Sequence, residues 1–220
     1  MVKIYGVNGG PRKKWNTATM LNSFLEGAAS VGEHVEVEAV HLFDLKYTGC
    51  VSCFACKREG SGYGKCTVKD DIFQLLQEMP LADGFVLATP IYFHDITAQL
   101  RGFLERLFFQ FHSFEQGEET LAPKKLLSAM IYTMNVTEEI FNTDGYADNL
   151  EATQNYLEHT FGNRPELLYA FNTYEFTDYS KYKASYWNER DKADWKQRQF
   201  PLDCARAFEA GKRMAQKAGF

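Results

Sequence analysis

Short apolar runs alternate with longer segments of helical spacing along most of the chain. Residues 2–7 form a short run of apolar and β-prone side chains, which predicts a buried strand. After the turn formed by Asn8, Gly9, Gly10 and Pro11, apolar side chains recur at the spacing of one helix face: Met20, Leu21, Phe24, Leu25 and Ala28. The first 30 residues therefore predict a strand followed by an amphipathic helix.

The same alternation continues to the end of the chain. We expect further strands at residues 35–42, 84–88, 125–133 and 166–171, and helices at 70–79, 100–111 and 147–160. Residues 44–69 are predicted to be a loop, Thr89 and Pro90 to stop a strand, and the tail from residue 179 to be mostly helical with a break near Pro201. Residues 84–88 are almost entirely apolar, as in a central parallel strand covered on both faces. This order favours a doubly wound parallel sheet within one domain, residues 1–220.

Composition and charge exclude several classes of partner. Hydrophobic residues make up 45% and charged residues 24% of the 220, which is ordinary for a globular protein. The net charge is −5 and there is no long basic run, so neither nucleic acid nor an anionic membrane is an expected partner. No apolar stretch approaches the roughly 20 residues that cross a bilayer. The first residues have the pattern of a strand, not of a signal peptide, and we predict a cytoplasmic protein.

The loop after the first predicted strand has the chemistry of an anion site. Open α/β sheets bind ligands at the carboxyl ends of their strands, where residues 8–17 lie. Gly9 and Gly10 allow close approach of the backbone, Arg12 adds charge, and Asn16 and Thr17 are predicted to cap the following helix and to donate hydrogen bonds. The loop matches neither a Walker motif nor the dinucleotide fingerprint. It therefore indicates a phosphate site or, alternatively, an ordinary strand-to-helix turn.

Four of the five cysteines fall in one short segment. Cys50, Cys53, Cys56 and Cys66 have the spacing C-x2-C-x2-C-x9-C. Four thiolates that converge on one object suit an iron–sulfur cluster, here [4Fe-4S], and also suit zinc. The third interpretation is a set of reduced thiols in a loop. Cys204, in the predicted tail helix, is interpreted as a small buried residue.

Several segments together resemble a known family, the flavodoxin-like NAD(P)H-dependent FMN reductases and their relatives, the iron–sulfur flavoproteins. The segments are Gly-Gly-Pro-Arg, three residues and Asn-Thr at 9–17; Gly49 to Cys56 with its three cysteines; Cys66 followed by Asp70 and Asp71; Ala82, Asp83 and Gly84; and Thr89 to Phe93. The resemblance implies a five-stranded, three-layer α/β/α fold with FMN bound. An aromatic-rich helical extension from about residue 175 to 220 would follow the core.

The resemblance also implies roles for named residues. Arg12, Asn16 and Thr17 would hold the FMN phosphate within the loop segment that contributes Asn8, Gly9, Gly10, Arg12, Asn16, Thr17 and Ala18. Pro90, Ile91, Tyr92 and Phe93 would lie along the isoalloxazine ring, although they also suit a plain turn at a strand end. Met134 and Asn135, in the loop after the fourth strand, are placed to touch the other side of the ring. The family commonly has Ser where this chain has Gly10, and Gly where it has Trp15.

The functional hypothesis follows from the resemblance. NAD(P)H would give hydride to FMN, and electrons would pass to a quinone, a flavin, another small acceptor or a protein. No side chain is predicted to act as a catalytic acid or base; His94 suits a proton donor or, alternatively, an ordinary loop residue. The alternatives are an electron carrier without a pyridine nucleotide site, with the cluster as relay, and a flavin-free binding domain. A homodimer or homotetramer is expected, with aromatic residues of the helix at 100–111 and of the tail available for its interface.

Overall fold

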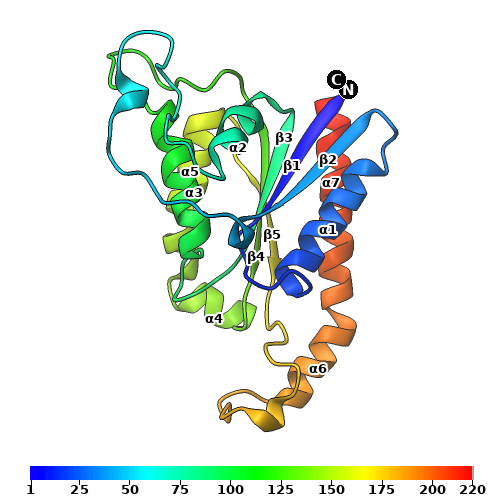
Figure 1. The fold of residues 1–220 in the computed structure, drawn as a ribbon. Coiled ribbons are helices and arrows are strands. Elements are labelled where there is room, and N and C mark those ends of the chain that lie inside the picture. Colours follow the sequence, from blue (N-terminus) through cyan, green and yellow to red (C-terminus); the bar gives the residue numbers. More distant parts are fainter. Residues whose placement is uncertain (220) are drawn as a thin grey trace.

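Five parallel strands form a single sheet in the order β2-β1-β3-β4-β5 (Figure 1). The computed structural model describes residues 1–219. The strands are β1 (Val2–Asn8), β2 (Val35–His41), β3 (Gly84–Pro90), β4 (Leu127–Thr133) and β5 (Glu166–Ala170). This flavodoxin-like strand order confirms the predicted fold class, because consecutive strands wind first to one side of β1 and then to the other.

Helices cover both faces of the sheet, as Figure 1 shows. One face packs against α1 (Asn16–Ala29) and α7 (Phe200–Ala218), and the other against α2 (Phe73–Glu78), α3 (Ala98–Phe111) and α5 (Tyr146–Phe161). The apolar stripe predicted on α3 lies in the second layer, where Phe103, Leu104 and Leu107 have no exposed surface. Two further helices are α4 (Glu138–Thr143) and α6 (Glu189–Arg198). No helix within residues 1–219 has the length and apolar content of a membrane span.

Several predicted element boundaries are wrong, and two of them have a local reason in the structure. β3 continues through Pro90, which pairs with Thr133 of β4, because a terminal proline costs the sheet little. α2 begins at Phe73, not Asp70, since the carboxylates of Asp70 and Asp71 are bound to Arg106 and to the Lys46 amide. The N-cap of α1 is Trp15. Asn16 and Thr17, predicted to cap the helix, are its first two residues.

The tail helix α7 crosses α1 at very close range. A Cβ atom built on Gly211 would lie 1.8 Å from the Phe24 carbonyl oxygen, and one on Gly27 would lie 1.9 Å from the Phe208 carbonyl oxygen. These distances are far below van der Waals contact, so the two glycines are what allows the backbones to approach. The crossing binds the C-terminal helix to the first βα unit.

We expect Gly211→Ala to lower the free energy of unfolding by about 3 kcal/mol, because the added methyl must push two helix backbones apart. Urea unfolding followed by circular dichroism measures the change. Gly219→Ala is the matched control, since its Cβ would meet nothing closer than 3.6 Å. Equal unfolding midpoints for the two variants would contradict the proposed packing.

Candidate functional site

A cleft opens at the carboxyl edge of the sheet, where the loops after β1, β3 and β4 meet the segment after β5. The chain leaves β1 toward α1 on one face and leaves β3 toward α3 on the opposite face, which is the switch point at which such sheets bind ligands. The cleft is lined by Gly10, Pro11, Arg12, Trp15, Asn16, Thr17, Pro90, Ile91, Tyr92, Thr133, Met134, Asn135, Thr173 and Glu175.

The β1 loop is packed tightly at the base of the cleft. The Gly10 amide donates to the Asn8 side-chain oxygen at 2.8 Å, and the Gly9 amide donates to the Ala88 carbonyl at 2.7 Å. A Cβ on Gly10 would lie only 3.1 Å from Cδ of Pro90 and from Oδ1 of Asn8. Glycine at position 10, in place of the family's usual serine, thus lets the β1 and β3 loops come together.

The first turn of α1 faces the same cleft with its amides free of side-chain caps. Within residues 1–219, no side chain caps this helix and no acidic residue occupies its first turn. Uncapped amides and the positive end of the helix dipole favour an anion there. Thr17 is buried and its hydroxyl lies 2.7 Å from the hydroxyl of Thr133, which joins the β1 loop to the end of β4.

The β3 loop supplies an apolar wall formed by Pro90, Ile91 and Tyr92. Burial raises the pKa of the Tyr92 phenol, although the charge of Arg12 acts in the opposite direction, so the wall is neutral at neutral pH. The backbones of Tyr92 and Asp95 form two mutual hydrogen bonds, at 2.8 and 3.1 Å. Both residues between them, Phe93 and His94, have positive φ, which turns Phe93 fully into solvent.

His94 is held by aromatic packing outside the cleft lining. Its ring stacks on the ring of Tyr146, with the centroids 3.9 Å apart and the planes at 13°. Asp95 next to it accepts two hydrogen bonds of 2.8 Å from Arg101. This geometry favours the interpretation of His94 as a loop residue with a structural contact.

The β4 loop contributes Asn135 to the cleft lining. Oδ1 of Asn135 is itself buried beneath the surface and has no hydrogen-bond partner within residues 1–219. Lys192 of α6 fixes the backbone beside it, because its ammonium donates to the Asn135 carbonyl at 2.8 Å and to Oδ1 of Asn172 at 2.9 Å.

The structure brings together most of the predicted cofactor residues. Nine line the cleft: Gly10, Arg12, Asn16, Thr17, Pro90, Ile91, Tyr92, Met134 and Asn135. Four do not: Asn8 bonds within the β1 loop, Gly9 packs against α3, Ala18 is buried in α1, and Phe93 points to solvent. The lining adds Pro11, Trp15, Thr133, Thr173 and Glu175, of which only Trp15 stood out in the sequence as a departure from the family.

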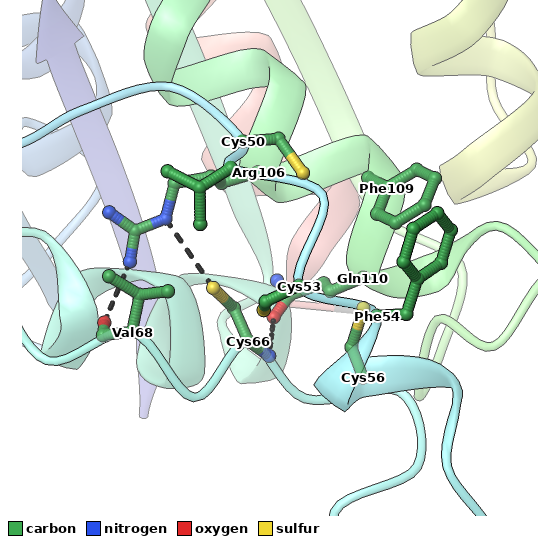
Figure 2. Close-up of a pocket in the computed structure, with 10 residues that line it drawn as sticks. Cys50, Cys53, Phe54, Cys56, Cys66, Val68, Arg106, Phe109 and Gln110 are labelled. Carbon is green, nitrogen blue, oxygen red and sulfur yellow. Dashed lines mark hydrogen bonds between the residues drawn. The ribbon is translucent and has the colours of Figure 1, made fainter.

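The four clustered cysteines line one small pocket beside the second half of α3 (Figure 2). Cys56 is buried, Cys53 is exposed and the other two are half-buried, with the rings of Phe54 and Phe109 packed edge to face at 5.8 Å on one side. Burial raises the pKa of the Cys56 thiol, against the opposing charge of Lys57. Within residues 1–219, no three His, Cys, Asp or Glu side chains converge closely enough for a single metal ion.

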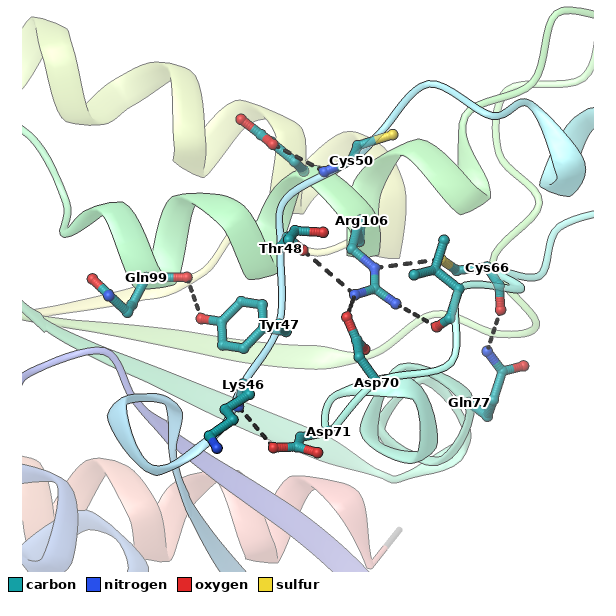
Figure 3. Close-up of polar contacts among 12 residues, drawn as sticks. Lys46, Tyr47, Thr48, Cys50, Cys66, Asp70, Asp71, Gln77, Gln99 and Arg106 are labelled. Carbon is teal, nitrogen blue, oxygen red and sulfur yellow. Dashed lines mark hydrogen bonds and ion pairs between the residues drawn. The ribbon is translucent and has the colours of Figure 1, made fainter.

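Arg106 holds both ends of the cysteine loop in place (Figure 3). Its buried guanidinium donates to Oδ2 of Asp70, to the carbonyls of Thr48 and Val68, and from Nε to Sγ of Cys66 at 3.4 Å. Burial disfavours the charged form of Arg106, but the bonds to Asp70 and Cys66 outweigh it and raise the pKa of the guanidinium. The pocket is thus built on a buried ion pair, a contact that sequence spacing does not reveal.

The family comparison covers the β1 loop, the cysteine segment, the β3 loop and the start of the β4 loop. The family model described as NADPH-dependent FMN reductase matches residues 2–136. The chain belongs to the NADPH-dependent FMN reductase family. The segment that follows β5 lies outside the matched residues.

Curated relatives of this chain are named iron–sulfur flavoproteins. One from Methanocaldococcus jannaschii is 35% identical over 105 residues, which cover 48% of this chain and 51% of the relative. One from Archaeoglobus fulgidus is 34% identical over 105 residues, which cover 48% of each chain. The chain spans about half the length of the curated relatives it matches.

Solved structures with the same fold share much less sequence. An NAD(P)H:quinone oxidoreductase from Methanothermobacter marburgensis superposes with a TM-score of 0.66 at 17% identity, over 97% of this chain and 96% of that one. An FMN-dependent NADH-azoreductase from Bacillus anthracis, in complex with FMN, has a TM-score of 0.61 at 15% identity, over 98% of this chain and 100% of that one. At these identities the likeness establishes the fold.

The pH dependence of stability provides a test of the Lys192 contact. Burial lowers the pKa of Lys192 from 10.5 to about 8, although the charge of Glu175 acts in the opposite direction. Between these two values the unfolded chain binds more protons than the folded chain, so the contribution of Lys192 to the free energy of unfolding increases as the pH rises from about 8 to 10.5.

We therefore expect the stability of the wild type relative to Lys192→Met to increase across that pH interval. Urea unfolding at several pH values measures the difference, which cancels the titration of tyrosines and cysteines common to both proteins. Lys196→Met, which replaces an exposed lysine of the same helix, is the matched control. If the stability difference between the wild type and Lys192→Met stays constant with pH, the lowered pKa of the buried Lys192 is contradicted.

Proposed function

We propose that this chain is an FMN-binding oxidoreductase that takes hydride from NAD(P)H and passes electrons to a quinone, a flavin or another small acceptor. The observation that carries the proposal is the composition of the cleft. One side is an apolar wall of Pro90, Ile91 and Tyr92, and the other is the uncapped start of α1 with Arg12 beside it. A ligand with a flat apolar ring and a phosphate matches this cleft, because the ring suits the apolar wall and the phosphate suits the start of α1.

The donors and acceptors in the cleft fit FMN. The amides at the start of α1, with Arg12 and Asn16, would hold the phosphate, and the β3 loop would lie along the ring. When bound, FMN supplies a ring that accepts hydride and releases electrons. The protein's part is to bind and orient that ring, so we assign no catalytic acid or base.

Anaerobic mixing with NADH and with NADPH tests this function. We expect at least one nucleotide to bleach the visible band of the FMN-loaded protein faster than it bleaches free FMN, because the cleft orients the ring. Dithionite serves as the control reductant. A band that dithionite bleaches but neither nucleotide does would contradict hydride transfer and favour an electron carrier.

A second candidate function, an iron–sulfur flavoprotein electron carrier, is favoured by the cysteine pocket. All four thiols line one cavity, and the Arg106 Nε–H donates to Cys66. Four soft ligands suit a cubane cluster, which is larger than a single ion and needs less convergence of the sulfurs. When bound, a cluster supplies a one-electron relay. Hydrogen bonds such as the one from Arg106 tune the potential of such a relay.

Iron and sulfide analysis of anaerobically prepared protein tests the cluster. We expect iron in the wild type, and loss of most of it in Cys53→Ala, because one of four ligands is removed. Cys204→Ala is the matched control, since this half-buried thiol lies in α7, far along the chain from the pocket. Equal iron content in the wild type and Cys53→Ala would reject the cluster.

The proposed oligomer has one supporting surface. An open groove lies between α3 and α5 and includes Phe108, Phe109 and Tyr156; the rings of Phe108 and Tyr156 stack at 5.8 Å. A homodimer or homotetramer that covers this groove fits the proposal. A cytoplasmic location stays a prediction from the sequence.

A further inference from the structure

The segment that follows β5 lies across the phosphate end of the cleft. Nη1 of Arg12 donates to the Glu175 carbonyl at 2.7 Å, and Nη2 lies 3.2 Å from Oε1 of Glu175. The Tyr174 carbonyl accepts two further bonds, from Nε1 of Trp15 at 3.1 Å and from Nδ2 of Asn16 at 3.0 Å. Three side chains of the β1 loop therefore bind two consecutive residues of a segment about 160 positions away.

These contacts use the donors that the proposed function assigns to the flavin phosphate. Arg12 is the cation of that loop whose guanidinium lines the cleft, and Glu175 places a full negative charge against it. A phosphate and a carboxylate are both oxygen anions that bind guanidinium through paired N–H groups. The two groups therefore compete for the same donors.

The segment is anchored on its other side, so Glu175 is held at Arg12. Both the amide and the hydroxyl of Thr173 donate to the Met134 carbonyl, at 3.0 and 3.1 Å. The Glu175 amide donates to the Tyr179 hydroxyl at 3.0 Å. The ammonium of Lys196 lies 4.7 Å above the ring of Tyr174. These contacts fix the backbone of the segment, so the Glu175 side chain starts close to Arg12 and loses less conformational entropy on pairing than one on a mobile segment would.

Trp15 adds ring contacts to its hydrogen bond with the segment. Here the indole N–H binds the Tyr174 carbonyl, and the guanidinium of Arg12 and the ammonium of Lys196 lie over the ring at 5.3 and 5.6 Å. Trp15 thus helps to hold the segment against the β1 loop.

We propose that Glu175 is a specificity-determining residue of the flavin site: by pairing with Arg12 it lowers the advantage that a phosphate gives to a ligand. The inference rests on the proposed function, because it takes the cleft as a flavin site. Its consequence is a small ratio of riboflavin to FMN dissociation constants. Riboflavin carries the same ring without the phosphate, so the ratio isolates the phosphate end.

The experiment is titration of flavin fluorescence with the full chain, using FMN and riboflavin separately. We expect Glu175→Gln to tighten FMN binding by about fivefold, the size of one exposed ion pair, and to leave riboflavin binding within about twofold. Asp194→Asn is the matched control. It removes the same charge from α6, where the partner of Asp194 within residues 1–219 is Arg198, and should change neither constant.

A second variant, Arg12→Ala, tests whether the effect of Glu175 depends on Arg12. In Arg12→Ala the preference for FMN should fall, and adding Glu175→Gln to it should have no further effect, because the competition needs both partners. If the wild type binds flavins but Glu175→Gln leaves FMN affinity unchanged or weaker, the inference is overturned while the proposed function stands. If neither flavin binds the wild type, the proposed function fails and the inference fails with it.

Discussion

The parallel pairing of β1 with β3 is the constraint on which the candidate site depends. The two strands end at the same edge, where Asn8 pairs with Ala88, but their loops must leave toward opposite faces. The loops are in contact at their base, through the Gly9 amide and the close approach of Gly10 to Pro90. Beyond that point they separate, and the space between them becomes the cleft.

Helix α3 connects the two candidate sites. Near its first residue the hydroxyl of Thr97 donates to the Gly9 carbonyl at 2.7 Å, which supports the β1 loop. Near its last residues Arg106, Phe109 and Gln110 line the cysteine pocket. Thirteen residues separate Thr97 from Gln110, which is about 20 Å along a helix. One rigid element thus positions both sites, and a buried ion pair with Asp70 fixes the cysteine loop to it.

The sequence predicts local features of this molecule well and distant contacts poorly. The apolar run at residues 84–88 and the glycine-rich turn after β1 depend on neighbouring residues, and both lie where the pattern places them. The contacts of the Tyr174 carbonyl had no such signal, because every residue carries a carbonyl and only the fold decides what it faces. The sequence likewise does not predict that Arg106 lines the cysteine pocket, since forty residues separate it from Cys66. The short helix α4 was missed because it has one buried residue, Phe141, and so no apolar periodicity.

The most direct test of the flavin site is the visible absorption spectrum of the protein purified without oxygen, followed by addition of FMN. The apolar wall and the uncapped start of α1, with Arg12 beside it, predict flavin bands that approach one FMN per chain. A colourless protein that also leaves added FMN free in solution would contradict the assignment of the cleft, and only the fold and the family would remain.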